Sequence, residues 1–134
     1  MTDVPIIPVV LVVDDSSVVR RQVIAALAKT GLHVLEASDG QQALGLFDSS
    51  SIAMLITDIN MPRMSGVELL TELAQRGIRV PTIVLTSEGQ ISSVRDARAA
   101  GALAWINKPF DADSLARSVL RALSRPSARA GGPP

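Results

Sequence analysis

The chain has 134 residues, contains no cysteine, and balances 13 lysine and arginine residues against 13 aspartate and glutamate residues. This length is the usual size of one domain, and a hydrophobic content of 47% is enough for a single buried core. Zero net charge gives no overall field that would favour nucleic acid or an anionic membrane, and the lack of cysteine excludes disulfides, thiolate nucleophiles and cysteine metal sites.

An apolar stretch at residues 6–13 begins close to the N-terminus and ends at two aspartates. A membrane span needs about 20 apolar residues, so this stretch is too short to cross a bilayer. It also lacks the basic leader and the small-residue cleavage site of a signal peptide. We therefore expect a cytoplasmic protein without membrane insertion.

Five short apolar runs predict β-strands, at residues 9–13, 33–37, 53–57, 82–86 and 102–106. Turn residues bound each run, and several runs are apolar on both faces, as strands covered by helices on both sides of a sheet must be. The fifth run is the weakest of the strand predictions, because alanine is a poor strand former.

Segments with helical spacing separate these runs and predict helices at residues 16–30, 40–47, 65–76, 90–100 and 114–124. In the first of them an apolar residue recurs every fourth position from Val19 to Leu27. Asp15 and Ser16 are candidate N-caps for this helix, and Gly31 suits the left-handed position that often follows a helix.

Strand and helix segments alternate along the chain, which predicts an α/β fold with a parallel sheet and helices on both faces. The expected strand order is 2-1-3-4-5, which we take from known doubly wound sheets and do not work out from this sequence. The folded domain should span residues 1–125. Residues 126–134 are rich in proline and glycine and lack apolar anchors, so we expect a disordered tail there.

Polar groups stand where four of the predicted strands end. Asp14 and Asp15 follow the first strand, Asp58 follows the third, Thr86 ends the fourth, and Lys108 comes after the fifth. In an open parallel sheet, ligands bind in the crevice outside the carboxyl ends of the strands. With the expected order the winding reverses between the first and third strands, so the crevice should open between the aspartate pair and Asp58.

This set of groups suits a divalent cation and a phosphoryl group. Three converging carboxylates repel one another unless positive charge lies among them, and Mg²⁺ typically takes one or two carboxylates together with a phosphate oxygen. Asp58 would then be a nucleophile that forms an acyl phosphate, with Lys108 and Thr86 as cationic and hydroxyl donors. The sequence contains no GxxxxGK[ST] motif, so a P-loop nucleotide hydrolase is excluded.

Four segments resemble the signature stretches of receiver domains of bacterial response regulators, the CheY-like family. They are VVDDS at residues 12–16, DINMPRMSG at 58–66, LTSEG at 85–89 and NKPF at 107–110. The resemblance covers about residues 9–124 and keeps the order and spacing of the family. It implies a flavodoxin/CheY-like three-layer sandwich and a two-component signalling role, in which Asp58 accepts a phosphoryl group from a sensor histidine kinase or a histidine phosphotransfer protein.

The same resemblance implies a metal site. Asp15, Asp58 and the backbone carbonyl of Asn60 would hold Mg²⁺, and Asp14 would act on it through water. The protein would catalyse only its own phosphorylation and dephosphorylation, so we do not expect an enzyme with a separate substrate.

The resemblance also implies a conformational switch. Thr86 would turn toward the phosphoryl group, and Trp105 would move inward behind it, at a position where the family more usually has Tyr or Phe. The peptide bond between Lys108 and Pro109 resembles a cis bond of the family. A surface on the fourth helix, fifth strand and fifth helix would then bind a downstream protein.

Each candidate residue also has an ordinary structural explanation. In that case Asp15 or Ser16 caps the first helix, Asp58 starts a turn before Pro62, Thr86 or Ser87 caps the fourth helix, and Lys108 is a solvated lysine. Trp105 is either the switch residue or a core residue, since a single tryptophan is usually buried. His33 has no second histidine or cysteine with which to share a metal, which favours a structural role.

Three classes of function remain open. The leading one is a stand-alone phosphoacceptor that either docks on a target protein or relays the phosphoryl group. The second is an aspartate-nucleophile phosphatase, in which Asn60 would occupy the place where a general acid is usual. The third is a receiver that serves only as a binding scaffold. Direct binding of nucleic acid is not expected, because no helix-turn-helix follows the predicted domain.

Overall fold

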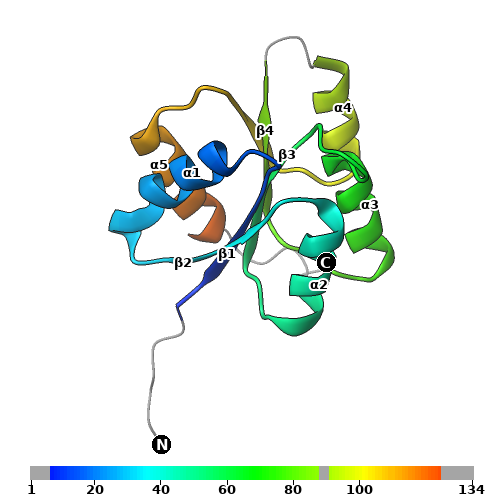
Figure 1. The fold of residues 1–134 in the computed structure, drawn as a ribbon, viewed down its shortest axis with the longest axis horizontal. Coiled ribbons are helices and arrows are strands. Elements are labelled where there is room, and N and C mark those ends of the chain that lie inside the picture. The colour runs from blue at the N-terminus through cyan, green and yellow to red at the C-terminus, as the bar shows by residue number, and fades with distance from the viewer. Residues whose placement is uncertain (1–6, 88–90, 125–134) are drawn as a thin grey trace, which may run out of the picture.

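The computed structural model describes residues 7–87 and 91–124, which contain one parallel sheet with the strand order β2-β1-β3-β4-β5 (Figure 1). The strands are β1 (Val9–Val13), β2 (His33–Ala37), β3 (Met54–Asp58), β4 (Thr82–Thr86) and β5 (Ala104–Asn107). The predicted α/β class and strand order are confirmed. The predicted tail at residues 126–134 and the predicted start of the fourth helix at residue 90 lie outside the described residues.

The connecting helices are α1 (Ser17–Leu27), a 3₁₀ turn (Ala28–Thr30), α2 (Gly40–Ser49), α3 (Gly66–Gln75), α4 (Ile91–Ala99) and α5 (Ala112–Ser124). Ser16 is the N-cap of α1, where its side chain accepts a hydrogen bond from the N–H of Val19 at 3.3 Å. Gly31 has the left-handed φ of 79° that was predicted for it. Helix α5 begins two residues earlier than predicted, because Asp111 accepts the N–H of Ser114 at 2.9 Å and so caps it.

The fifth strand begins two residues later than predicted. The N–H of Ala102 donates to the carbonyl of Ala97 at 2.9 Å, so this part of the apolar run closes α4 and does not start β5. Strand β3 is displaced by one residue and therefore includes Asp58 as its last residue. An offset of one or two residues at an element end is ordinary, and it leaves the predicted topology unchanged.

Helices cover both faces of the sheet, as Figure 1 shows: α1 and α5 lie on one side, and α2, α3 and α4 on the other. Alternate strand residues point to opposite faces, so each strand contributes to two cores. Leu11, Leu55 and Val84 pack on the side of α2, α3 and α4. Ile56 and Leu85 pack on the opposite side with residues of α1 and α5. Within the described ranges, no helix has the length and apolar character that a bilayer crossing requires.

Candidate functional site

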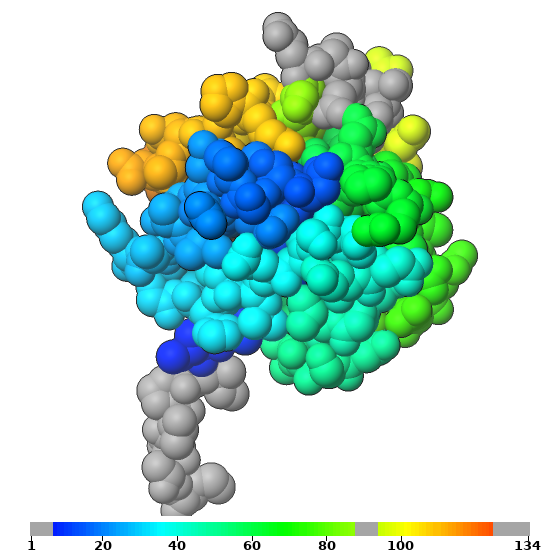
Figure 2. All heavy atoms as spheres, in the orientation of Figure 1, coloured from blue at the N-terminus to red at the C-terminus, as the bar shows by residue number. Residues whose placement is uncertain are grey.

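Three carboxylates meet at the carboxyl edge of the sheet. Asp14 directly follows β1 and Asp58 ends β3, and these strands pair in register through Val13 and Thr57. The two aspartates are therefore brought side by side. Asp14, Asp15 and Asp58 each offer an oxygen, and these atoms lie within 4.8 Å of one another. Figure 2 shows the start of α1 in blue beside the green segment that follows β3, so the crevice lies where the winding reverses.

The two adjacent aspartates have different surroundings. Asp14 is completely buried, and its Oδ1 accepts a hydrogen bond from the N–H of Ser16 at 2.9 Å. Its Oδ2 accepts one from Nζ of Lys108 at 3.2 Å, and its own N–H donates to the carbonyl of Ala37 at 3.1 Å. Asp15 is exposed. Asp14 is thus fixed inside the crevice, while Asp15 brings a carboxylate to it from the solvent side.

Asp58 is only 6% exposed, and one of its carboxylate oxygens contacts two donors. Its Oδ1 accepts the N–H of Ile59 at 2.8 Å and lies 3.3 Å from Nζ of Lys108. Burial raises the pKa of Asp58, and the charge of Asp14 raises it further, against the smaller lowering effects of Lys108 and Ile59. The ionised carboxylate therefore needs more positive charge than Lys108 supplies, which is the condition that a bound cation meets.

Lys108 directly follows β5 and contacts both buried carboxylates. Its Nζ lies 3.2 Å from Asp14 and 3.3 Å from Asp58. Burial is the largest single effect and disfavours its charge, but the attractions of Asp58 and Asp14 and the hydrogen bonds to them together outweigh it, so the pKa of Lys108 is raised. The ammonium is therefore charged at neutral pH. The Lys108–Pro109 peptide bond is cis, as the resemblance implied.

Thr86 and Trp105 lie on neighbouring strands at the β4–β5 side of the crevice. Thr86 is 2% exposed, and its hydroxyl donates to Oδ1 of Asn107 at 2.8 Å. Trp105 is 43% exposed, with the guanidinium of Arg98 5.5 Å from its ring centroid. The alternative that Trp105 is a core residue is therefore wrong, because its ring lies at the surface beside α4.

The loop between β3 and α3 is held close to Asp58. The N–H of Gly66 donates to the carbonyl of Ile59 at 2.7 Å, and a Cβ at position 66 would collide with the carbonyl oxygen of Asp58. Arg63 has a φ of 70° and forms an ion pair with Asp39 at 2.8 Å. Glycine at position 66 is what allows α3 to begin so near the site. Asn60 is exposed in this loop, and the role of its backbone carbonyl as a metal ligand stays a prediction.

Two contacts of the site were missed by the sequence interpretation. Arg20 on α1 donates to the backbone carbonyl of Asp14 at 2.6 Å and forms an ion pair with Glu36 at 2.9 Å. The available signal was its position four residues after Ser16, which is one turn along the predicted helix. The second is the bond from Thr86 to Asn107, which becomes apparent only once the register of β4 and β5 is known.

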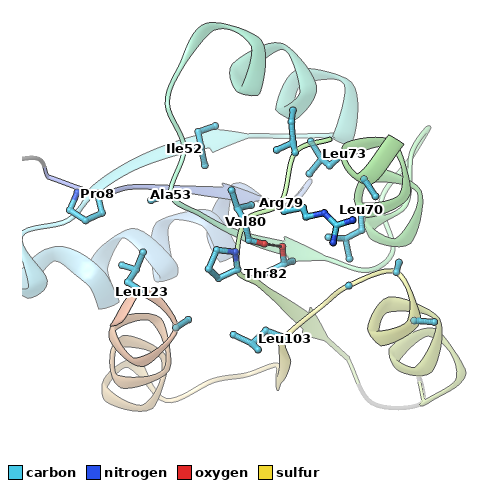
Figure 3. Close-up of a pocket in the computed structure, with 17 residues that line it drawn as sticks. Pro8, Ile52, Ala53, Leu70, Leu73, Arg79, Val80, Thr82, Leu103 and Leu123 are labelled. Carbon is cyan, nitrogen blue, oxygen red and sulfur yellow. Dashed lines mark hydrogen bonds between the residues drawn. The ribbon is translucent and has the colours of Figure 1, made fainter. Parts of the chain in front are cut away.

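A pocket of about 810 Å³ lies elsewhere, at the opposite edge of the sheet (Figure 3). Pro8, Ala53 and Thr82 line it at the amino ends of strands. Most of the other lining residues named for it are apolar, and Arg79 is the charged one among them. It lacks the gathered carboxylates, so the crevice at the carboxyl edge is the candidate site.

The family model described as the response regulator receiver domain matches residues 10–120. The chain belongs to this family. Receiver domains are the phosphorylation-switched signalling modules of two-component systems, so the predicted family and the coarse functional class are confirmed.

Relatives of this receiver include proteins of very different length. It is 35% identical over 116 residues to the chemotaxis protein CheY of Bacillus subtilis, covering 86% of this chain and 97% of the relative. It is 36% identical over 114 residues to the regulatory protein AtoC of Escherichia coli, covering 85% of this chain but 25% of the relative. It also spans 57% of the transcriptional regulatory protein PdtaR of Mycobacterium tuberculosis, at 35% identity and with 87% of this chain covered. The crystal structure of FixJ-N matches with a TM-score of 0.82 at 33% identity, over 96% of this receiver and 99% of that chain.

Replacing Asp58 by Asn should stabilise the metal-free receiver near neutral pH. Burial and Asp14 raise the pKa of Asp58, so the folded state holds this proton more tightly than the unfolded state. The stability that depends on Asp58 is then greatest below the ordinary aspartate pKa of about 3.9 and falls as pH rises through the raised folded value. Urea unfolding with a chelator should show the gain of Asp58→Asn over the parent growing with pH.

The matched control is Asp96→Asn, which changes an exposed aspartate on α4. Its stability relative to the parent should vary little over the same pH range. An Asp58→Asn variant that is less stable than the parent at neutral pH would mean that the ion pair with Lys108 outweighs the cost of burial.

Proposed function

We propose that this receiver is the phosphoacceptor of a two-component phosphorelay and that Asp58 carries the phosphoryl group. The observation that supports this best is the grouping of buried Asp58 with Asp14 and Asp15, within 4.8 Å, and with the ammonium of Lys108 at 3.3 Å. The donor would be a phosphohistidine on a sensor histidine kinase or a histidine phosphotransfer protein. The transfer is chemically simple, and it depends mainly on positioned charge.

In this transfer a carboxylate oxygen of Asp58 attacks the phosphorus of the phosphohistidine. The new P–O bond forms as the P–N bond breaks, and the leaving imidazole nitrogen takes up a proton. The ammonium of Lys108 lies next to the attacking carboxylate and stabilises the negative charge on the phosphoryl oxygens. Thr86 supplies a hydroxyl that donates to one of those oxygens after its present bond to Asn107 is broken.

The residues present fit a Mg²⁺ ion. Asp15, Asp58 and the backbone carbonyl of Asn60 would hold it, and Asp14 would contact it through water. Hard carboxylate and carbonyl oxygens are the donors that Mg²⁺ prefers, and oxygens of three carboxylates lie within 4.8 Å of one another here. When bound, Mg²⁺ supplies positive charge that balances the crowded carboxylates and the incoming phosphoryl group.

The output surface would lie on α4, β5 and α5. Exposed arginines there include Arg95 and Arg98 on α4 and Arg121 on α5, which favour an acidic partner protein. Trp105 on β5 is part of this surface, where its ring lies next to Arg98. We expect the downstream protein to present acidic groups to these arginines.

We further propose that the protein acts as a stand-alone module in the cytoplasm and does not bind nucleic acid directly. Relatives with and without additional length match this receiver equally well, as CheY at 97% coverage and AtoC at 25% coverage illustrate. Action as a stand-alone module therefore stays a prediction. The cytoplasmic location and the lack of direct binding to nucleic acid also stay predictions.

The acceptor is tested with acetyl phosphate and Mg²⁺. One phosphoryl group should be added per chain, seen by intact mass spectrometry, and it should be stable in acid and labile in base, as an acyl phosphate is. Asp58→Asn should abolish the addition, whereas Asp48→Asn, on the exposed part of α2, should leave it intact. Full labelling of the Asp58→Asn protein would place the acceptor at another residue.

Binding of Mg²⁺ is tested by calorimetric titration of the unphosphorylated receiver. Asp15→Ala should weaken the affinity at least tenfold, because it removes one of the carboxylates that would contact the ion. Without metal the same change should leave stability equal or higher, since it reduces repulsion among the three carboxylates. Equal affinities in the parent and in Asp15→Ala would exclude Asp15 as a ligand.

Trp105 reports on the switch through its own fluorescence. Because 43% of this residue is exposed, an inward movement on activation should shift its emission to shorter wavelength. Beryllofluoride, a phosphoryl mimic, is added with Mg²⁺ already saturating, so that quenching by the metal is excluded. An unchanged spectrum in protein whose Asp58 is shown to be occupied would assign Trp105 to the surface contact with Arg98 alone.

A further inference from the structure

Thr86 and Asn107 are directly opposite each other on the adjacent strands β4 and β5. Paired residues of a parallel ladder point to the same face, so both side chains lie on the face that α2, α3 and α4 cover. The hydroxyl of Thr86 donates to Oδ1 of Asn107 at 2.8 Å. A hydroxyl has a single proton, so in this state Thr86 has no proton to offer to any other acceptor.

The backbone holds Asn107 firmly in this place. The N–H of Lys108, the next residue, donates to the carbonyl of Thr86 at 2.7 Å, which fixes the two strands at this point. Nζ of the same lysine contacts Asp14 and Asp58. Asn107 is therefore fixed between the crevice and Trp105, which is two residues away on the same face of β5.

We propose that Asn107 is a positioning residue that holds Thr86 in its resting orientation and so sets how readily the receiver is activated. The inference rests on the proposed function, in which the hydroxyl of Thr86 donates to a phosphoryl oxygen. That oxygen is an acceptor, and so is Oδ1 of Asn107, so the two compete for one proton. A charged phosphoryl oxygen forms a hydrogen bond roughly twice as strong as a neutral amide oxygen does, so Thr86 stays with Asn107 at rest and leaves it on phosphorylation.

The test measures the dissociation constant of beryllofluoride with saturating Mg²⁺, followed by ¹⁹F NMR of the bound fluoride. Asn107→Ala removes the competing acceptor, and it should tighten beryllofluoride binding roughly two- to tenfold, the range that one net hydrogen bond covers. Asn107→Asp keeps an accepting oxygen at the same place and should give no gain. In the metal-free protein, the ¹³C shift of the Thr86 methyl group should change in Asn107→Ala, because the acceptor of its hydroxyl is lost.

A double-mutant cycle separates action through Thr86 from a general structural effect. Thr86→Val removes the hydroxyl while keeping the shape, so Asn107→Ala should not change beryllofluoride affinity in that background. The same gain with and without the hydroxyl, or no gain in the parent, would overturn the inference.

If instead the unaltered receiver fails to bind beryllofluoride at all, the proposed function is overturned. Urea unfolding of each variant confirms that it folds, and Asn107→Leu, which also lacks the acceptor, replaces Asn107→Ala if that variant does not.

Discussion

The structure depends on one electrostatic arrangement, in which the ammonium of Lys108 lies between the buried carboxylates of Asp14 and Asp58 at 3.2 and 3.3 Å. One positive charge faces two negative ones, and both carboxylates are buried. Lys108 is the shared partner of both carboxylates, and its removal would leave two buried charges unpaired, which is strongly destabilising. The remaining negative charge makes the crevice receptive to a cation. Burial and, after it, the charge of Asp14 raise the pKa of Asp58, which is a cost to folding when this carboxyl is ionised.

Backbone contacts hold the carboxylates in this unfavourable proximity. Arg20 binds the carbonyl of Asp14 and ties the end of β1 to Glu36 on β2. On the other side, Gly66 allows the start of α3 to approach the carbonyl of Asp58. These contacts act on the main chain and do not neutralise the carboxylates. They therefore fix the geometry while leaving the charge of the site available to ligands.

The sequence predicted the sheet and the position of the candidate site because both depend on local pattern. Apolar runs of five residues located the strands, and polar residues at their ends marked the crevice. What it did not predict depends on contacts between distant segments. The exposure of Trp105 follows from where α4 lies, and the bond between Thr86 and Asn107 follows from strand register. The late start of β5 has the same origin, since Ala102 is used to close α4.

The β4–β5 pair gives the fold a direct physical connection from the crevice to its surface. Thr86 contacts Asn107, Asn107 shares a strand face with Trp105, and Trp105 stacks against Arg98 of α4. Under the proposed function, the hydroxyl proton of Thr86 would have a second acceptor in the phosphoryl group, and the exposed ring of Trp105 would have a second, more buried environment. For the crevice and the surface to be coupled, the contacts at each of the two sites must differ between the two states. In the proposed function, a phosphoryl group on Asp58 would supply the first, and the partly exposed ring of Trp105 beside Arg98 would supply the second.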